Sequence, residues 1–151
     1  MIKFWRMESG SYKIEPDSLF KFLVEKGYYT YRPGGDGDSI LIRIKGNRIS
    51  LHSARSIRGY CNDYIRDVFV FQSEEEKTQV TNEFMNSKSR FSKEDLLLLK
   101  PAEIEEVRDT KEMSFIFFKN CYFEITAEEV KKKSYDQLSG HVWEKDIINF
   151  E

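Results

Sequence analysis

Residues 109–126 are Asp109-Thr-Lys-Glu-Met-Ser-Phe-Ile-Phe-Phe-Lys-Asn-Cys-Tyr-Phe-Glu-Ile-Thr126, and Gly140-His-Val-Trp-Glu-Lys-Asp-Ile-Ile148 follows a little later. Short apolar and aromatic runs flank Lys119-Asn120-Cys121, which is typical of a tight turn between two strands. Residues 130–135 and 141–148 are two further strand candidates, separated by a turn that ends at Gly140. The last third of the chain is therefore predicted to form an antiparallel β-meander.

The clearest hairpin signal lies earlier in the chain. Residues 40–45 alternate in the two-residue period of a strand, Gly46-Asn47 fits a two-residue turn, and residues 48–52 supply the partner strand. Helices are predicted for residues 16–26, for residues 53–68 and after the capping patterns at Ser73–Glu76 and Ser92–Asp95. The predicted fold class is α+β: an N-terminal β-hairpin with amphipathic helices, a helical middle and the C-terminal meander.

The chain length of 151 residues fits one domain, with a possible subdivision into residues 1–88 and 89–151. A boundary is expected either between Asn86 and Ser92 or near Lys100-Pro101. Apolar residues make up 40% of the chain and aromatic residues 15%, enough for a substantial core. The net charge of −2 argues against a protein that coats DNA without specificity, because such binding depends on many uncompensated cations. A net charge near zero does not exclude a local basic patch.

The two cysteines, Cys61 and Cys121, show no spacing typical of zinc ligands and are predicted to be buried apolar thiols. No metal and no cofactor are predicted. The N-terminal sequence Met1-Ile-Lys-Phe-Trp-Arg6 lacks the apolar run of a signal peptide, and no segment approaches the length of a membrane span. A cytoplasmic protein without membrane contact is the expectation.

A basic stretch between Ser39 and Asn62 contains no acidic residue. Cations on a two-stranded ribbon and on the helix that follows can contact phosphates, and a solvated surface of no special function is the alternative. The candidate nucleic-acid-binding residues are Arg43, Lys45, Arg48, Arg55 and Arg58.

Asp36 and Asp38, with His52 a short distance downstream, form the one arrangement that suggests catalysis. Two carboxylates one residue apart can bridge a divalent metal, and a nearby imidazole can contact a nucleotide phosphate. The pattern faintly resembles the signatures of archaeo-eukaryotic primases. The two aspartates lie in a glycine-rich segment, however, where turn conformation alone favours glycine and aspartate. No catalytic residue is therefore assigned.

Two groups of phrases resemble primase-helicase-like replication proteins from phages and mobile elements of gut Bacteroidetes. The N-terminal group comprises Phe4-Trp5 to Lys13-Ile14, Leu19-Phe-Lys-Phe-Leu23, Gly27-Tyr28, Ser39-Ile-Leu-Ile-Arg-Ile44 and Ile57 to Ile65. The C-terminal group comprises Asp109-Thr-Lys111, Phe115 to Phe118 with Lys119-Asn120, Glu124-Ile-Thr126, Tyr135 and Gly140-His-Val-Trp-Glu144.

In that family the corresponding region precedes a superfamily-three helicase core, a hexameric ring ATPase. The resemblance implies an accessory region of such a helicase, in a bacterial or phage-infected cell, with DNA and the ATPase domain or other subunits as partners. The Walker motifs of the helicase have no counterpart in this chain, so no catalysis is expected of the chain by itself.

Three hypotheses follow for the function. The leading one is a non-catalytic accessory module that contacts DNA or orders the helicase ring. The second is a protein-interaction or oligomerisation module without nucleic-acid contact, using an apolar patch, for example around Tyr135 and Trp143. The third is a small primase- or nuclease-like enzyme that uses Asp36, Asp38 and His52.

Overall fold

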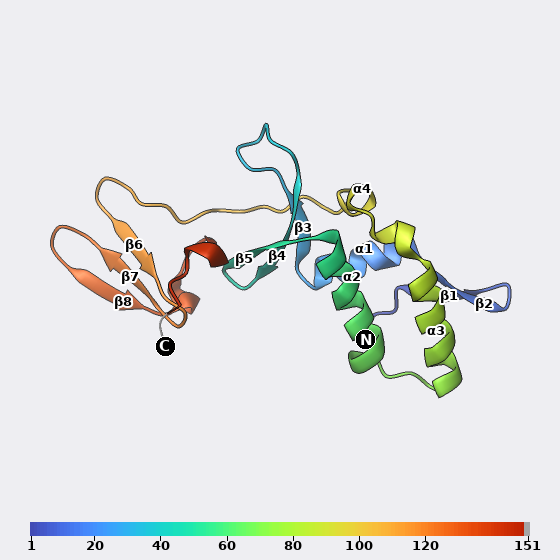
Figure 1. Ribbon diagram of the computed structural model, residues 1–151. Helices are drawn as coiled ribbons and strands as arrows, with labels where there is room; N and C mark the ends of the chain where they lie inside the picture. Colours follow the sequence, from blue (N-terminus) through green and yellow to red (C-terminus); the bar gives the residue numbers. More distant parts are fainter. Residues whose placement is uncertain (150–151) are drawn as a thin grey trace. The chain divides into compact units, whose positions relative to one another are not determined.

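The computed structural model describes residues 1–149 and has an α+β fold, as predicted (Figure 1). The chain divides into two compact units. The first comprises Met1–Arg43 and Leu51–Ala102, and the second comprises Ile44–Ser50 and Glu103–Glu151. The division falls after Ala102. A short segment from the middle of the chain belongs to the second unit, which no local sequence signal indicates.

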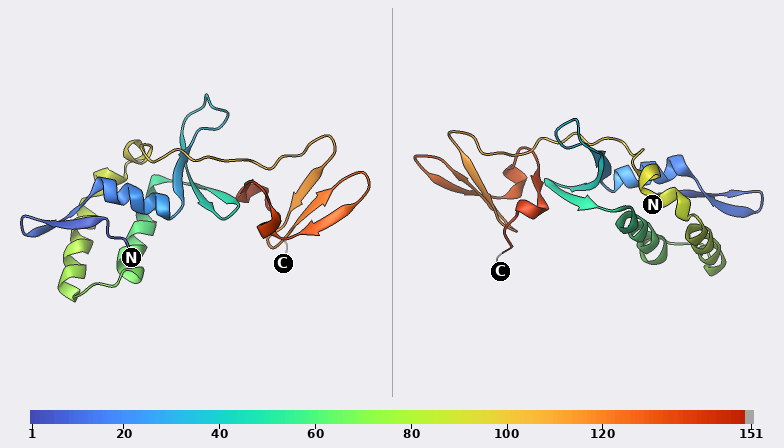
Figure 2. Two further views of the ribbon diagram at one scale, coloured as in Figure 1. Left: turned by 180° about the vertical axis from the view of Figure 1, so that it is seen from behind. Right: turned by 45° about the horizontal axis from the view of Figure 1, so that its top comes forward.

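The first unit is built mainly of helices. Its hairpin of β1 (Trp5–Glu8) and β2 (Ser11–Ile14) packs against α3 (Glu74–Asn86) (Figures 1 and 2). Its elements are β1 (Trp5–Glu8), β2 (Ser11–Ile14), α1 (Pro16–Glu25), β3 (Tyr28–Tyr31), α2 (Ala54–Asp63), the π-helical turn η1 (Tyr64–Val68), α3 (Glu74–Asn86), the 3-10 turn η2 (Lys88–Phe91) and α4 (Lys93–Leu96).

Aromatic rings form the centre of this unit. The Phe22 ring on α1 lies 4.9 Å from the Phe4 ring and 4.5 Å from the Tyr64 ring, measured between centroids. Each buried ring removes a large apolar area from water, so these contacts dominate the packing of the unit. The helix predicted for residues 53–68 is α-helical only to Asp63. The π-helical turn changes the register of the side chains, and Val68, predicted to be on the apolar face, is exposed.

The predicted hairpin is confirmed at both strands, β4 (Ile40–Lys45) and β5 (Arg48–His52). Strand β3 pairs with β4 in antiparallel register, and the sheet order is β3-β4-β5-β9, where β9 is Val142–Trp143. The base of the hairpin belongs to the first unit. Its tip, Ile44–Ser50, belongs to the second unit and is called the hairpin tip below.

The second unit contains a three-stranded antiparallel sheet, drawn in orange in Figures 1 and 2. It packs on a small core of Phe117, Tyr122, Leu138, Val142 and Ile147. Its elements are β6 (Ser114–Phe117), β7 (Tyr122–Ile125), β8 (Val130–Lys133), the 3-10 turn η3 (Tyr135–Gln137), β9 (Val142–Trp143) and the 3-10 turn η4 (Glu144–Asp146).

The prediction of a fourth antiparallel strand over residues 141–148 is wrong. Only Val142 and Trp143 form a strand, and they pair in parallel with Arg48 and Ile49 of the hairpin tip. The backbone N–H of Val142 donates to the Asn47 carbonyl at 2.8 Å, which directs this segment to β5 instead of to the meander.

An amide side chain adds to the contacts that hold the hairpin tip in the second unit. Asn47 Nδ2 donates to the carbonyls of Leu138 and Gly140, at 3.0 and 2.9 Å. Gly140 has a φ of +105°, and a Cβ atom at this position would lie 2.6 Å from the Glu105 carbonyl oxygen. Glycine is required here for conformation and for space.

Among residues 1–149, no helix is both long and apolar enough to cross a lipid bilayer.

Candidate nucleic-acid interface

The start of α2 presents a basic surface on the first unit. Ser53 caps the helix, since its hydroxyl accepts from the Ser56 backbone N–H and the Ser56 hydroxyl accepts from the Ser53 N–H. Arg55 lies in the first turn, where no acidic residue is present. A cation at the positive end of a helix dipole is mildly unfavourable. The position is therefore better suited to receiving an anion than to stabilising the helix.

Arg55 and Arg58 are three residues apart on α2, so they share one face of the helix. They border a hollow of about 280 Å3, called the Arg58 hollow below. Its lining consists of Arg55, Arg58, Gly59, Asn62, Phe84 and Met85. The Arg58 guanidinium lies 5.7 Å from the centroid of the Phe84 ring and donates a long hydrogen bond of 3.5 Å to the Met85 carbonyl. Its Nε is buried and has no acceptor among residues 1–149.

Arg55 also borders a second hollow, of about 370 Å3, called the His52 hollow below. His52 is held there by contact of its Nδ1 with the Ser56 hydroxyl at 3.0 Å and by an edge-on contact with Tyr28. None of the lining side chains is a carboxylate. They are Ile40, Leu41, Leu51, His52, Ser53, Ala54, Arg55 and Lys93. The two hollows thus meet at Arg55, and Arg55, Arg58 and Lys93 supply their positive charges.

Arg43 has a different environment from the arginines of α2. Its Nε donates to the Lys26 carbonyl at 3.0 Å, and its guanidinium lies 5.0 Å and 4.7 Å from the ring centroids of Tyr28 and Tyr60. Burial raises the pKa of Tyr28 to about 12, although the nearby Arg43 charge opposes that rise. Arg43 is half-buried and packs the sheet against α2, and it lines neither hollow.

Lys45 and Arg48 lie in the hairpin tip, in the other unit. The Arg48 guanidinium is 4.7 Å from the centroid of the Tyr135 ring and donates to the Lys119 carbonyl. Lys45 is exposed. Of the five predicted residues, the structure brings only Arg55 and Arg58 together at the hollows. It adds Lys93, which the prediction missed although the Ser92 cap places it in the first turn of α4.

The aspartates of the catalytic hypothesis, Asp36 and Asp38, are both exposed, in the segment between β3 and β4. Among residues 1–149, no three or more His, Cys, Asp or Glu side chains are grouped so that they could hold a metal ion. Both cysteines are free thiols. Cys61 is fully buried, and burial raises its pKa, whereas Cys121 is only half-buried.

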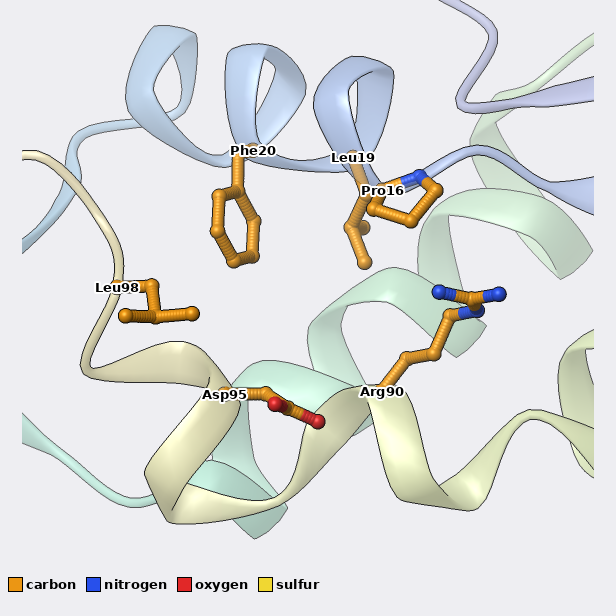
Figure 3. Close-up of a pocket in the computed structure, with 6 residues that line it drawn as sticks. All are labelled: Pro16, Leu19, Phe20, Arg90, Asp95 and Leu98. Carbon is orange, nitrogen blue, oxygen red and sulfur yellow. The ribbon is translucent and has the colours of Figure 1, made fainter.

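A third and smaller hollow, of about 160 Å3, lies between α1 and the segment around α4 (Figure 3). Phe20 and Leu98 face each other at one end of it, and Arg90 lies beside Pro16 at the other. Asp95 contributes a carboxylate to the rim, so this hollow is less suited to a phosphate than the two that meet at Arg55.

Comparison with protein-family models, with curated proteins and with solved structures gives no match to this chain.

Proposed function

We propose that this chain is a non-catalytic accessory module of a mobile-element DNA replication helicase, and that its first unit contacts DNA. Two lines support the proposal: the sequence resemblance, and the pair of hollows that meet at Arg55. The two hollows are the main support for DNA contact, because basic side chains line them and none of their lining side chains is a carboxylate. The module would act in the cytoplasm of a bacterial or phage-infected cell, beside the ATPase domain or other subunits of the helicase.

The chemistry of the hollows suits a sugar-phosphate backbone. Arg55 can offer several N–H donors to phosphate oxygens, and Lys93 adds a point charge. Arg58 can offer only the donors that its long bond to the Met85 carbonyl leaves available. Phe84, Met85 and Leu51 give apolar walls beside these cations. Contacts of this kind bind and position DNA, but they do not select a sequence. We therefore expect DNA affinity that depends steeply on salt and weakly on base sequence.

The test is a fluorescence-anisotropy titration of the whole chain with single-stranded, forked and duplex DNA at two salt concentrations. Arg55→Glu should weaken binding about tenfold or more and should lower the salt slope by about one ion per lost phosphate contact. Lys13→Glu is the matched control, because it makes the same charge change at an exposed position of β2. Equal losses in the two variants, or no DNA binding by the parent chain at low salt, would contradict the proposal.

A second function, an interaction module without DNA contact, is favoured by apolar exposure in the second unit. The exposed patch does not centre on Tyr135 and Trp143. The Tyr135 hydroxyl donates to the Phe118 carbonyl at 2.6 Å, and Trp143 Nε1 donates to a Glu106 carboxylate oxygen at 2.7 Å. The Trp143 bond, together with Arg108, lowers the pKa of Glu106. The exposed apolar residues of the second unit are instead Ile116 and Val130, on the three-stranded sheet, and Ile148.

A further inference from the structure

The core of the second unit covers one face of the sheet of β6, β7 and β8, and that face also carries the Glu124–Lys133 ion pair and Lys131. Strand side chains alternate between the faces. The register therefore places Phe115, Phe117 and Tyr122 on the covered face, where their rings contact one another. The opposite face, called the outer face below, carries Ser114, Ile116, Phe123, Ile125, Val130 and Lys132, and Phe118 just beyond the end of β6.

The outer face is apolar and partly open. Val130 is 62% exposed and Ile116 is 37% exposed, while Phe118 and Phe123 are half-buried against each other with ring centroids 5.7 Å apart. A contiguous apolar surface with only one charged side chain is uncommon on a protein that works alone in water. Such a surface is typical of an interface.

Charges of opposite sign lie at the two ends of this face. The turn between β7 and β8 brings the exposed Glu128 and Glu129 to one end, and Glu129 pairs with Lys131 at 2.9 Å. At the other end are Lys132, on the outer face opposite Phe123, and Lys119, in the turn between β6 and β7. The face is therefore electrostatically complementary to a copy of itself that runs in the reverse direction.

We propose that the outer face binds a second copy of this chain, sheet against sheet. The twofold axis lies between the two sheets and perpendicular to the strands. It sets each β8 over the partner copy's β8 in the opposite direction, and it brings Lys132 of one copy to the Glu128 end of the other. Two sheets packed in this way bury both apolar faces at the usual separation of about 10 Å. This inference goes beyond the proposed DNA contact and does not rest on it.

A second copy fits this face better than nucleic acid does. Three of its five apolar side chains are β-branched aliphatic residues, Ile116, Ile125 and Val130, which pack well against another sheet but offer no ring to stack on a base. The face has a single cation of its own, Lys132, whereas a strand of DNA would need several along its path. Because the face has only four-residue strands, we expect a weak dimer with a dissociation constant on the order of 100 μM.

The experiment is sedimentation equilibrium of the whole chain, from about 10 μM to about 1 mM, a range that spans the expected dissociation constant. Lys132→Glu should raise the dissociation constant about tenfold, because each of the two symmetry-related pairs changes from attraction to repulsion. Glu128→Lys should do the same, and the double swap Lys132→Glu with Glu128→Lys should restore dimerisation. Lys111→Glu is the matched control, since it makes the same charge change at an exposed residue outside the strands.

Val130→Lys provides a separate test of the apolar contact, at an exposed edge-strand position where the fold should tolerate it. Far-UV circular dichroism confirms that each variant is folded. A weakened dimer in Val130→Lys, together with rescue by the double swap, supports the proposal. A parent chain that stays monomeric across the whole range overturns it, as does a dimer that neither Val130→Lys nor Lys132→Glu weakens. Neither result bears on DNA binding at Arg55, so the two proposals fail separately.

Discussion

The hairpin tip and the first turns of α2 are both basic and lie only a few residues apart in the chain, yet they use their arginines differently. Arg48 of the tip lies over a tyrosine ring and donates to a backbone carbonyl of its own unit. Arg55 of α2 is exposed and borders two hollows. One arginine holds the fold together and the other is available to a ligand.

The difference shows that a cluster of cations in the sequence is not a binding site until the acceptors around it are known. A guanidinium that lies over a tyrosine ring and bonds to a carbonyl has much of its binding capacity already occupied. Arg43, over Tyr28 and Tyr60, belongs with Arg48 in this respect.

The largest effect is expected for Gly140→Ala. The new Cβ would meet the Glu105 carbonyl oxygen at 2.6 Å, and alanine would be strained at a φ of +105°. We expect the second unit to lose about 3 kcal/mol of unfolding free energy. Urea unfolding followed by Trp143 fluorescence, in a Trp5→Phe background, measures this. Gly46→Ala is the control, since Gly46 has a φ of +63° but open space at its Cβ position. Equal losses in the two variants would contradict the role of the close contact.

Asn47→Ala should have the next largest effect. It removes the donor that serves the carbonyls of Leu138 and Gly140, and it leaves both in a partly buried setting without that partner. The expected loss is about 2 kcal/mol, again in the second unit. Thermal unfolding measured against Asn120→Ala, a change at an exposed turn residue, isolates the effect. If the two variants have the same melting temperature, the Asn47 amide does not stabilise the hairpin tip.

The sequence predicted the parts of this fold that depend on neighbouring residues. The alternation in residues 40–52, the two-residue turn and the Ser53 cap are local signals, and both strands and the cap are confirmed. The parallel pairing of Arg48 with Val142 was not predictable, because it joins two residues far apart in sequence through a strand of only two residues. Asn47 donates a hydrogen bond to Gly140, 93 positions away in the sequence, and no local sequence pattern predicts such a bond.

The sequence predicted only part of the candidate site, again because it shows neighbouring residues and not contacts between distant ones. Residue type and spacing on one helix identified Arg55 and Arg58, since residues three apart share a helix face. Whether an arginine already has a partner depends on distant side chains, such as Tyr135 beneath Arg48, and a single sequence does not show them. Tertiary packing places Lys93 of α4 at the His52 hollow beside Arg55 of α2. A local sequence pattern does not predict this packing.

Arg48→Ala tests the structural half of the comparison. Loss of the contact with Tyr135 and of the bond to the Lys119 carbonyl should reduce the unfolding free energy by about 1 kcal/mol. Arg48→Lys should recover little of this, because an ammonium group lacks the planar guanidinium that stacks on a ring. Urea unfolding shows whether the geometry or the charge matters. Full recovery with lysine would mean that charge alone is sufficient at this position.

Arg55→Ala tests the exposed arginine of the comparison and should have the smallest effect on the free energy of unfolding. Its side chain is exposed, and it lies at the positive end of the α2 dipole. Removing it should leave the unfolding free energy within about 0.5 kcal/mol of the parent value. DNA affinity should nevertheless fall by about the amount that one phosphate contact contributes, which the anisotropy titration measures. A loss of stability as large as that of Arg48→Ala would place Arg55 among the structural arginines, and the comparison between the hairpin tip and α2 would no longer hold. Unchanged stability with weakened DNA binding is the combination that only an arginine reserved for a ligand should show.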